Sequence, residues 1–461
     1  DLKPGTDYIL NWKARAGSAL NGNTEIGYIT DSGQKFSRLP APPVKSSQPN
    51  QSFYTPHSLY FTTPEKLTYN GKSGVLIALK PLFYSNAARP WIDVSGLQLF
   101  EKTPPVTAAP APTPAPAPAP AKPSDKFSVE KKITFTDMGI KNSLDNFPLY
   151  FTYSDSSLKN VQQGGKIING NDIAFTDENG RLLDFEIEKY NEKTGVLSAW
   201  IICPKYSTSS GIKLSYGKEG VKTPLDNRTG VWKNYAGVWH LDNASLADSA
   251  SKNLNGKLNE GASSTNGILG SAVKFNGKTG YADLGNSDSL RKISGSFTTS
   301  FWFKYAGAPS NKSLINTLLN KNYLTGTGYL DPFHFYLYVS ENKEKGSLSV
   351  RTGNKTAEKY LGGSLAFSDQ KYHFATFSFD ADNRIANIYI DGAEKGSTDV
   401  NGFRPATDTD SPLTLGVWYP GYNYFNGIID EVKISNSAKS SDWIKAEYLN
   451  QYSPAKFYSI K

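Results

Sequence analysis

The stretch YNYFNGIIDEVKIS, residues 422–435, reads as a β-strand with an acidic residue in the middle of its apolar face. With a side-chain period of two, Ile428, Asp430, Val432 and Ile434 share one face, and three of these four residues are apolar. A carboxylate buried without partners is strongly destabilising. We therefore expect Asp430 to meet either a cation or several hydrogen-bond donors, and we expect Glu431 to point to the opposite face.

Short segments of the same kind recur along the whole chain and predict an all-β protein. Residues 1–102 contain TDYILNWKARA and GVLIALKPLFY, and residues 125–235 contain KKITFTD, FPLYFTYS, NDIAFTDENG, LLDFEIEKY, VLSAWIICP and GIKLSYG. From residue 236 the strand segments include FHFYLYVSE, KYHFATFSFD and IYIDGAEKG, with Asp391-Gly392 as a hairpin turn. SSDWIKAEYLNQ, residues 440–451, is the one segment that looks helical. Many short strands with turn signals between them favour β-sandwiches or jelly rolls throughout.

The Pro/Ala-rich segment TPPVTAAPAPTPAPAPAPAKPS, residues 103–124, predicts a linker. Alternating Pro and Ala cannot form a helix or a central strand, and they favour a polyproline II spacer of roughly 70 Å at about 3.1 Å per residue. The boundaries that follow are a first β-sandwich over 1–102, the linker over 103–124, a small β-sandwich over 125–235 and a jelly roll over 236–461.

Composition excludes several classes of protein. The single cysteine, Cys203, rules out an intramolecular disulfide framework and cysteine-rich zinc sites. The net charge of +8 comes from scattered Lys and Arg without a basic block, so a mixed-charge surface is favoured over a nucleic-acid interface. No apolar run reaches the ~18 residues of a membrane span. Scarce Cys and Met with abundant Asn, Ser, Thr, Gly and Tyr are typical of secreted or surface-exposed bacterial proteins. DLKPGTDY is not a signal peptide, so either a signal has been removed or the chain is a piece of a longer one.

Six motifs in the last stretch together resemble the LamG-type, concanavalin A-like jelly-roll lectin family. They are GVWHLDNASLADSASKNLNGKL, GILGSAVKFNGKTGYADLG, GSFTTSFWFK, YHFATFSFD, NIYIDGAEKG and FNGIIDEVKISNSAKS, in one order over residues 236–461. This resemblance implies two packed antiparallel sheets, a carbohydrate- or protein-binding role, and a calcium ion near the first and last motifs.

Two further resemblances concern the rest of the chain. Residues 125–235, through NFPLYF, NDIAFTDENGRLLDFEIEKY, AWIICP and GIKLSYGKEG, resemble the bacterial domain of unknown function that commonly precedes LamG-type domains. The closing AEYLNQYSPAKFYSI resembles the usual tail of that pair. Residues 1–102 resemble the later strands of a carbohydrate-binding module jelly roll, through LKPGTDYILNWKARA and WIDVSGLQLFEK.

The LamG resemblance implies a structural calcium ion held by Asp248, Asn253 and Asp430, with Glu431 as a weaker candidate ligand. Calcium prefers six to eight oxygen ligands from carboxylates, carbonyls and amides, at about 2.4 Å. Ala250 and Ser251 stand where the family usually carries Ser-Gly, which departs from its pattern. The alternative is that Asp430 accepts hydrogen bonds from backbone N–H groups of a neighbouring loop.

Aromatic residues provide the candidate sugar contacts. LGVWYPGYNYFNG, residues 415–427, places Trp418, Tyr419 and Tyr422 around a Pro-Gly turn, where flat rings can stack on a sugar and hydroxyls can bond to it. Tyr424 and Phe425 lead into the strand and are expected in the core. In the first domain, Trp12 and Trp91 are candidate stacking residues, and Tyr54 and Tyr84 are further candidates. The alternative for each ring is packing in a core or against a neighbouring domain.

No motif in the sequence predicts catalysis. Asp184, Glu186 and Glu188 recur on one strand face, as acids do in laminarinase-type glycosidases, but neighbours on such a face lie roughly 6.6 Å apart along the strand, whereas retaining glycosidases need about 5–5.5 Å. A solvated strand face is the favoured interpretation. The four histidines show no zinc spacing; His240 and His373 are expected to be buried or hydrogen-bonded, and Cys203 to be a buried thiol.

The sequence thus predicts a non-catalytic, extracellular or cell-surface glycan-binding or adhesion protein whose partners are polysaccharides or cell-surface glycans. Other surface proteins or copies of the same chain remain possible partners, and neither nucleic acid nor membrane insertion is expected. One alternative is a structural fibre, surface-layer or protein-interaction element. The other is the targeting portion of a larger polysaccharide-degrading enzyme.

Overall fold

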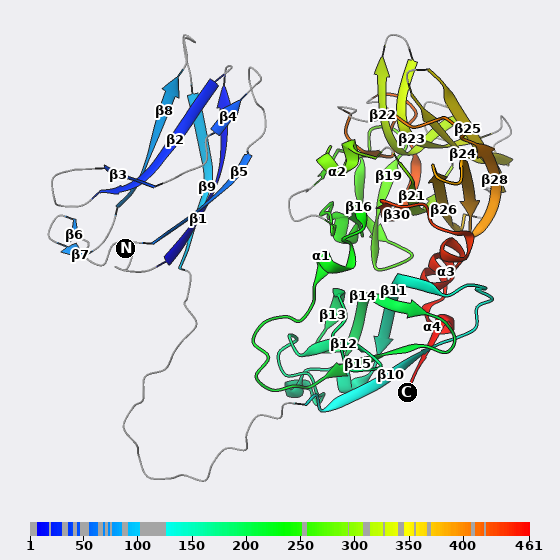
Figure 1. The fold of residues 1–461 in the computed structure, drawn as a ribbon, viewed down its shortest axis with the longest axis horizontal. Coiled ribbons are helices and arrows are strands. Elements are labelled where there is room, and N and C mark those ends of the chain that lie inside the picture. The colour runs from blue at the N-terminus through cyan, green and yellow to red at the C-terminus, as the bar shows by residue number, and fades with distance from the viewer. Residues whose placement is uncertain are drawn as a thin grey trace. The chain divides into compact units, whose positions relative to one another are not determined.

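The computed structural model describes residues 126–250, 256–293, 295–307, 314–325, 328–339, 345–354, 356–366, 370–406, 411–418 and 421–461, with the backbone alone for 322–331, 345, 365 and 366. In the first 101 residues it describes the backbone of the strands. The chain divides into two compact units, Asp1–Ala119 and Pro120–Lys461 (Figure 1).

The first unit is built from antiparallel strands. One sheet has the order β5-β1-β9, a second has the order β3-β2-β4 with β8 paired to β2, and a third pairs β6 with β7. The strands are β1 Asp7–Gly17, β2 Leu20–Ile29, β3 Phe36–Leu39, β4 Val44–Ser46, β5 Thr55–Thr62, β6 Thr68–Tyr69, β7 Lys72–Ser73, β8 Leu76–Tyr84 and β9 Trp91–Glu101.

The second unit begins with a small lobe of two antiparallel sheets, ordered β12-β15-β10-β31 and β11-β14-β13. Its strands are β10 Val129–Phe135, β11 Leu144–Ser154, β12 Ile173–Asp177, β13 Phe185–Asn191, β14 Val196–Tyr206, β15 Gly211–Tyr216 and β31 Tyr458–Ile460. Single helical turns lie at Ser156–Leu158, Val161–Gln163 and α1 Arg228–Val231. All six strands predicted within residues 125–235 are therefore present.

The large lobe packs two broad antiparallel sheets face to face. The eight-stranded sheet has the order β18-β19-β30-β21-β26-β27-β28, with β16 paired to β30; the seven-stranded sheet has the order β17-β20-β29-β22-β23-β24-β25. The eight strands are β16 Tyr235–Trp239, β18 Ala262–Asn266, β19 Ser271–Asn276, β21 Phe297–Tyr305, β26 Tyr372–Asp380, β27 Ile385–Ile390, β28 Ala393–Asp399 and β30 Asn426–Ser435. The seven are β17 Lys257–Leu258, β20 Ala282–Asp283, β22 Ile315–Thr325, β23 Gly328–Val339, β24 Lys345–Gly353, β25 Glu358–Ala366 and β29 Thr414–Leu415.

The predicted hairpin turn at Asp391-Gly392 joins β27 to β28. Ile390 pairs with Ala393, and both turn residues have positive φ angles, 52° for Asp391 and 74° for Gly392. That backbone is the type I′ turn that Asp-Gly favours. Short helical segments in this lobe are Asp242–Ala244 and α2 Asp288–Arg291. The predicted all-β class is confirmed.

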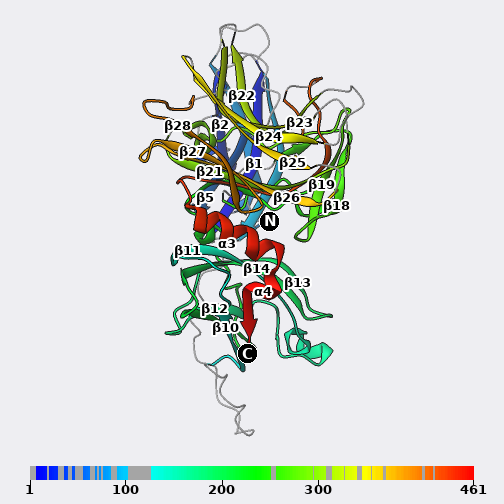
Figure 2. The ribbon, with the colours of Figure 1, turned by 90° about the vertical axis from the view of Figure 1, so that its right-hand side faces the viewer.

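The C-terminal segment holds the two lobes of the second unit together. Helix α3, Ser441–Tyr452, confirms the predicted helix, and Ser440 caps it by accepting the N–H of Trp443 at 3.2 Å. Figure 2 shows α3 along the boundary between the lobes, with α4, Pro454–Phe457, beyond it. The chain then enters the small lobe, where β31 pairs with β10. No helix among the described residues is long and apolar enough to cross a bilayer.

Each lobe has its own apolar core. The small-lobe core takes Trp443 and Phe457 from the C-terminal segment, and it includes Cys203, which is 1% exposed, as predicted for a buried thiol. The large-lobe core lies between the two broad sheets and is rich in phenylalanine, with Phe301, Phe335 and Phe377 among its members.

Strand β30 corrects the alternation expected for residues 428–434. Trp302 pairs with Asp430, but Ser300 pairs with Lys433, so β30 contains one extra residue, a β-bulge, at Glu431. Glu431 has a φ of 53°.

The bulge reverses the expected arrangement of side chains. Ile429, Val432 and Ile434 point into the core, whereas Asp430, Glu431 and Lys433 all lie on the outer face, toward the small lobe. The predictions that Asp430 shares a face with Val432, and that Glu431 points away from Asp430, are wrong.

Candidate functional site

The outer face of the seven-stranded sheet carries aromatic and hydroxyl side chains in rows. Along β23, Phe333, Phe335 and Leu337 belong to the core, so the residues between them, His334, Tyr336 and Tyr338, face outward. The register with the neighbouring strands places Arg351, Ser349 and Ser347 of β24 opposite these three. Tyr360, Gly362 and Ser364 of β25 complete the rows. We call these residues, together with Trp418, the sheet face.

Trp418 joins the sheet face from the loop that follows β29. Its ring is parallel to that of His334, with the ring centroids 6.2 Å apart and an interplanar angle of 14°, and its carbonyl accepts the amide N–H of Asn320 at 3.0 Å. His334 is fixed beneath it by a 3.0 Å hydrogen bond between Nε2 and the Thr317 hydroxyl. Burial, and then the charge of Arg351, hold the pKa of His334 well below its usual value, so its ring is neutral.

The outermost tyrosines of the sheet face are open to solvent. Tyr338 is 46% exposed and Tyr360 is 57% exposed, and the Tyr360 hydroxyl bonds to Glu358. Tyr336 lies beside His334, with ring centroids 5.1 Å apart. Because exposed rings alternate with hydroxyls on a rigid sheet, this surface can stack on sugar rings and hydrogen-bond to their hydroxyls.

The other aromatic residues of the segment 415–427 differ in their exposure to solvent. Tyr422 is 60% exposed on the loop before β30, whereas Tyr419 lies outside the described residues. Phe425 is in the core, as expected, and Tyr424 is half-buried, with its hydroxyl accepting the N–H of Gly421 at 2.9 Å. The loop is tied to the sheet by the N–H of Thr317, which donates to the carbonyl of Asn423 at 3.0 Å.

In the first unit, the candidate stacking residues are placed by backbone alone. Trp12 lies in β1 opposite His57 of β5, and Trp91 begins β9 opposite Gly17. Tyr84 ends β8, and Tyr54 lies outside the described residues. The side chains of these residues are likewise outside the described part, so their roles stay predictions.

A second polar site is buried between the two lobes. Glu186 of β13, His240, Glu431 and Lys433 form what we call the buried ion cluster. His240 Nδ1 lies 3.0 and 3.1 Å from the carboxylate oxygens of Glu431, and Nε2 lies 3.3 Å from Glu186 Oε2. Lys433 Nζ lies 3.0 Å from Glu431 Oε2 and 4.3 Å from the centre of the Trp200 ring. His240 therefore bridges one carboxylate from each lobe, and the prediction that it is hydrogen-bonded is confirmed.

Neighbouring donors complete the coordination of the small-lobe acids. Glu186 accepts the Trp232 indole N–H at 2.5 Å and the Ser249 hydroxyl at 2.8 Å, and Glu188 accepts the Trp200 indole N–H at 2.7 Å. Glu186 is 8% exposed. The expectation of a solvated strand face is therefore wrong for this residue, because β13 turns its acids toward the large lobe.

The charge states follow from these contacts. Burial acts to lower the pKa of His240, but Glu431 and Glu186 outweigh it and raise that pKa well above its usual value. Burial acts to raise the pKa of Glu186 and of Glu431, but the charge of His240 and the hydrogen bonds that each carboxylate accepts together outweigh it, so both pKa values are lowered. Burial, and then Glu431, raise the pKa of Glu188 to about 8. At neutral pH the cluster thus contains an imidazolium between two carboxylates.

The donor atoms of Glu188, His240 and Glu431 all lie within 4.8 Å of one another, a spacing that would suit a metal. These groups already have protein partners, because both ring nitrogens of His240 are hydrogen-bonded to carboxylates and the Lys433 ammonium contacts Glu431. We therefore interpret this group as a network of ions and hydrogen bonds.

The predicted calcium ligands each have protein donors. Asp430 Oδ2 accepts the backbone N–H groups of Ile268 at 2.9 Å and Leu269 at 3.2 Å. Asp248 Oδ1 accepts those of Val238 and Ala250, both at 2.9 Å. Glu431 binds His240 and Lys433.

Glu431 is bound by two basic side chains, whereas Asp430 Oδ1 is buried and has no hydrogen-bond partner among the described residues. Asn253 lies outside the described residues, and the calcium ion stays a prediction. Burial, and then the charge of Glu431, raise the pKa of Asp430 well above its usual value. A protonated Asp430 would be a weaker calcium ligand.

Sequence reasoning missed Tyr336, Tyr338 and Tyr360 as outward-facing residues, and it missed Glu186 as an interface residue. For the sheet face a signal was available, since FHFYLYV alternates Phe and Leu with His and Tyr over residues 333–339. For Glu186 the sequence gives no such signal, because its partner His240 is 54 residues away in the other lobe.

Comparison with known proteins finds a family model that matches part of the large lobe. Residues 276–445 match the model of the concanavalin A-like lectin/glucanases superfamily, and no curated protein matched the chain. Among solved structures, the binding domain of Paraclostridial Mosquitocidal Protein 1 is 17% identical with a TM-score of 0.38, over 48% of this chain and 52% of that one. The binding domain of botulinum neurotoxin serotype G is 14% identical with a TM-score of 0.38, over 47% and 51%.

A third solved structure is domain 4 of the extracellular arabinanase AbnA from Geobacillus stearothermophilus in complex with arabinotriose. It is 21% identical, with a TM-score of 0.34, over 46% of this chain and 97% of that one. The chain spans about half the length of the two toxin binding domains. In sequence, the segment 276–445 is therefore similar to the concanavalin A-like lectin/glucanases superfamily.

Proposed function

We propose that the protein binds glycans without catalysis, and that the sheet face of the large lobe is the surface that holds the sugar. The observation that carries this proposal is the row of Trp418, His334 and Tyr336, continued by the solvent-exposed Tyr338 and Tyr360. Trp418 is half-buried and backed by the neutral His334, so it is already rigid before a ligand arrives. A preorganised ring loses little entropy on binding.

The arrangement of carboxylates supports a binding role over a hydrolytic one. Glycoside hydrolysis needs a pair of carboxyl groups on the two sides of the scissile bond. Among the described side chains of β22 to β25, Glu358 is the single carboxylate, and it is bonded to Tyr360. Glu186 and Glu431 lie near each other, on the two sides of His240, but both are buried between the lobes, where a polysaccharide cannot reach them.

We further propose that the protein works outside the cell, at a surface or in a secreted form, and that it attaches to polysaccharide or cell-surface glycan. The superfamily match over 276–445 and the composition of the chain support this setting. An open sheet face suits long glycan chains, which can lie across several rows of side chains at once. A second binding unit on the same chain would raise the effective concentration of the glycan.

A glycan array with the whole chain, followed by titration calorimetry on the best ligand, tests the proposal. Trp418→Ala should weaken binding at least tenfold, which is about 1.4 kcal/mol, and Tyr360→Ala should weaken it less. Tyr452→Ala is the matched control, since Tyr452 is 52% exposed but lies in α3, away from the sheet face. An empty array, or a Trp418→Ala variant with full affinity, would contradict the proposal, and an empty array would favour a structural or protein-binding role.

A further inference from the structure

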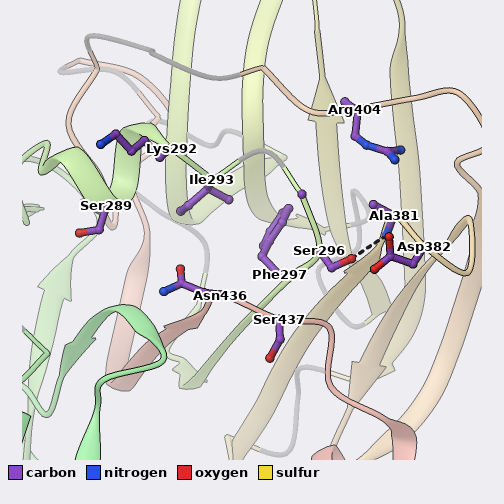
Figure 3. Close-up of a pocket in the computed structure, with 11 residues that line it drawn as sticks. Ser289, Lys292, Ile293, Ser296, Phe297, Ala381, Asp382, Arg404, Asn436 and Ser437 are labelled. Atoms are coloured by element: carbon purple, nitrogen blue, oxygen red, sulfur yellow. Dashed lines mark hydrogen bonds between the residues drawn. The ribbon is translucent and has the colours of Figure 1, made fainter. Parts of the chain in front are cut away.

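A pocket at one end of the large lobe is separate from the sheet face and has a different chemistry. It has a volume of about 720 Å³ and is formed where several elements end: the turn after α2, the start of β21, the turn after β26 and the segment after β30. Figure 3 shows Lys292 and Arg404 on different sides of it. This volume is within the range of about 300–1,000 Å³ that small-molecule sites occupy.

The bottom of the pocket is apolar and its rim is polar. Ile293, Phe297 and Ala381 line it and are 5%, 1% and 7% exposed. Ser296 accepts the N–H of Ala381 at 3.0 Å, which leaves its own hydroxyl proton free to donate (Figure 3). The side-chain amide of Asn436 has no hydrogen-bond partner among the described residues. A sugar ring could set its C–H face on the apolar bottom and its hydroxyls against Ser296 and Asn436.

The charges of the pocket favour an anion. Within the described part of the chain, neither Lys292 nor Arg404 forms an ion pair; the nearby carboxylate of Asp288 is bound by Arg291 at 2.5 Å. Arg404 is oriented by a 2.9 Å hydrogen bond from Nη1 to the carbonyl of Phe403. Asp382 is the single carboxylate that lines the pocket, so the lining carries two cations against one anion.

We propose that this pocket is a second binding site, for a saccharide unit that carries one carboxylate, such as a uronic acid. The net single positive charge of the lining matches one carboxylate better than a multiply charged group. Lys292 and Arg404 attract the carboxylate by their charge from different sides of the pocket, while Asn436 and Ser296 bind ring hydroxyls. The inference rests on the proposed glycan-binding function of the same lobe and adds a second, charge-selective site to it.

The test compares a galacturonate disaccharide with its methyl ester, which has the same shape without the charge, by titration against the whole chain. The acid should bind at least tenfold more tightly than the ester, and this preference should shrink as salt is added. Lys292→Gln and Arg404→Gln should each weaken binding of the acid about tenfold and leave binding of the ester unchanged. Asp382→Asn should strengthen binding of the acid.

Two control variants make the outcome decisive. Lys274→Gln removes an exposed lysine of β19 that does not line the pocket, and it should have no effect. Trp418→Ala alters the sheet face and should leave binding of the acid intact, which separates failure of this site from failure of the sheet face. Equal affinity for acid and ester, or loss of acid binding in Trp418→Ala but not in Lys292→Gln, would overturn the proposal.

Discussion

His240 is the residue on which the contact between the two lobes depends most directly. It hydrogen-bonds Glu431 of the large lobe and Glu186 of the small lobe, and it is 8% exposed. Two buried carboxylates in one site are tolerated only because a cation lies between them.

Replacing His240 by Ala should lower the free energy of unfolding by about 3–5 kcal/mol, since it leaves both carboxylates without their shared partner. Denaturant unfolding of residues 120–461 measures this loss. His373→Ala is the matched control, because His373 pairs with Asp391, which is one-third exposed, and should cost about 1 kcal/mol or less. A loss below 1 kcal/mol for His240→Ala would mean that the two acids are neutral.

The buried ion cluster should also give stability a maximum in mildly acidic solution. His240 has a folded-state pKa above 6.5, so its contribution is complete below pH 6.5 and is lost as the pH rises through the folded-state pKa. Glu188, with a pKa of about 8 in place of 4.5, loses its contribution as the pH rises from about 4.5 to 8.

Glu186 and Glu431 act in the opposite direction. Their folded-state pKa values lie below 4.5, so their contribution is present above pH 4.5 and is lost as the pH falls through those lower values. We expect the unfolding free energy to be highest between about pH 4.5 and 6.5 and the His240→Gln variant to show a flatter profile. A wild-type profile that rises steadily to pH 9 would contradict this assignment.

At the scale of elements, helix α3 contacts both lobes, and its side chains hydrogen-bond to residues of strands in each of them. Asn450 accepts the N–H of Tyr150 at 2.7 Å and donates to its carbonyl at 2.9 Å, so an amide from the helix completes the backbone hydrogen bonds of β11. On the other lobe, Gln451 accepts the indole N–H of Trp302 at 2.7 Å.

The Asn450→Leu variant should therefore be destabilised by about 2–4 kcal/mol, because the backbone N–H and C=O of Tyr150 lose their hydrogen bonds to the Asn450 side chain. Thermal and denaturant unfolding measure the change. Ser441→Ala, at an exposed position of the same helix, serves as the control and should stay within about 0.5 kcal/mol of wild type. A near-neutral Asn450→Leu would indicate that water replaces the amide.

How far each element could be predicted depended on whether its cause was local. The hairpin at Asp391-Gly392 and helix α3 were predictable because turn chemistry and composition within a few residues determine them. The bulge at Glu431 could not be predicted. His240 and Lys433 hold the Glu431 side chain on the outer face, and the pattern of apolar and polar residues around Glu431 does not show these contacts. Of the sheet face, the sequence indicated Trp418 alone; Tyr422 is exposed but lies on the loop before β30.

At the scale of the whole molecule, the last twenty-one residues, 441–461, belong to the fold of both lobes. Trp443, Phe457 and Tyr458 lie in the small-lobe core. Strand β31 pairs with β10 of the same sheet across a separation of 325 residues at Thr134 and Ser459. The small lobe therefore cannot close until the large lobe has been synthesised.

Deleting residues 441–461 should unfold the small lobe, because its sheet loses a strand and its core loses three large aromatic rings. Limited proteolysis with mass spectrometry should then show cleavage within residues 126–235 and protection of the large-lobe strands. Deletion of residues 1–119, which form the other compact unit, is the control and should leave that protection unchanged. Equal protection of residues 126–235 in both deletions would contradict the role assigned to the tail.

Cys203 makes this opening measurable without any engineered label. It is the one thiol of the chain, it is enclosed in strand β14, and burial raises its pKa to about 12, so it has almost no thiolate at neutral pH. A maleimide dye should consequently react only with molecules in which β14 has become accessible. The rate of dye incorporation then reports how often the small lobe opens.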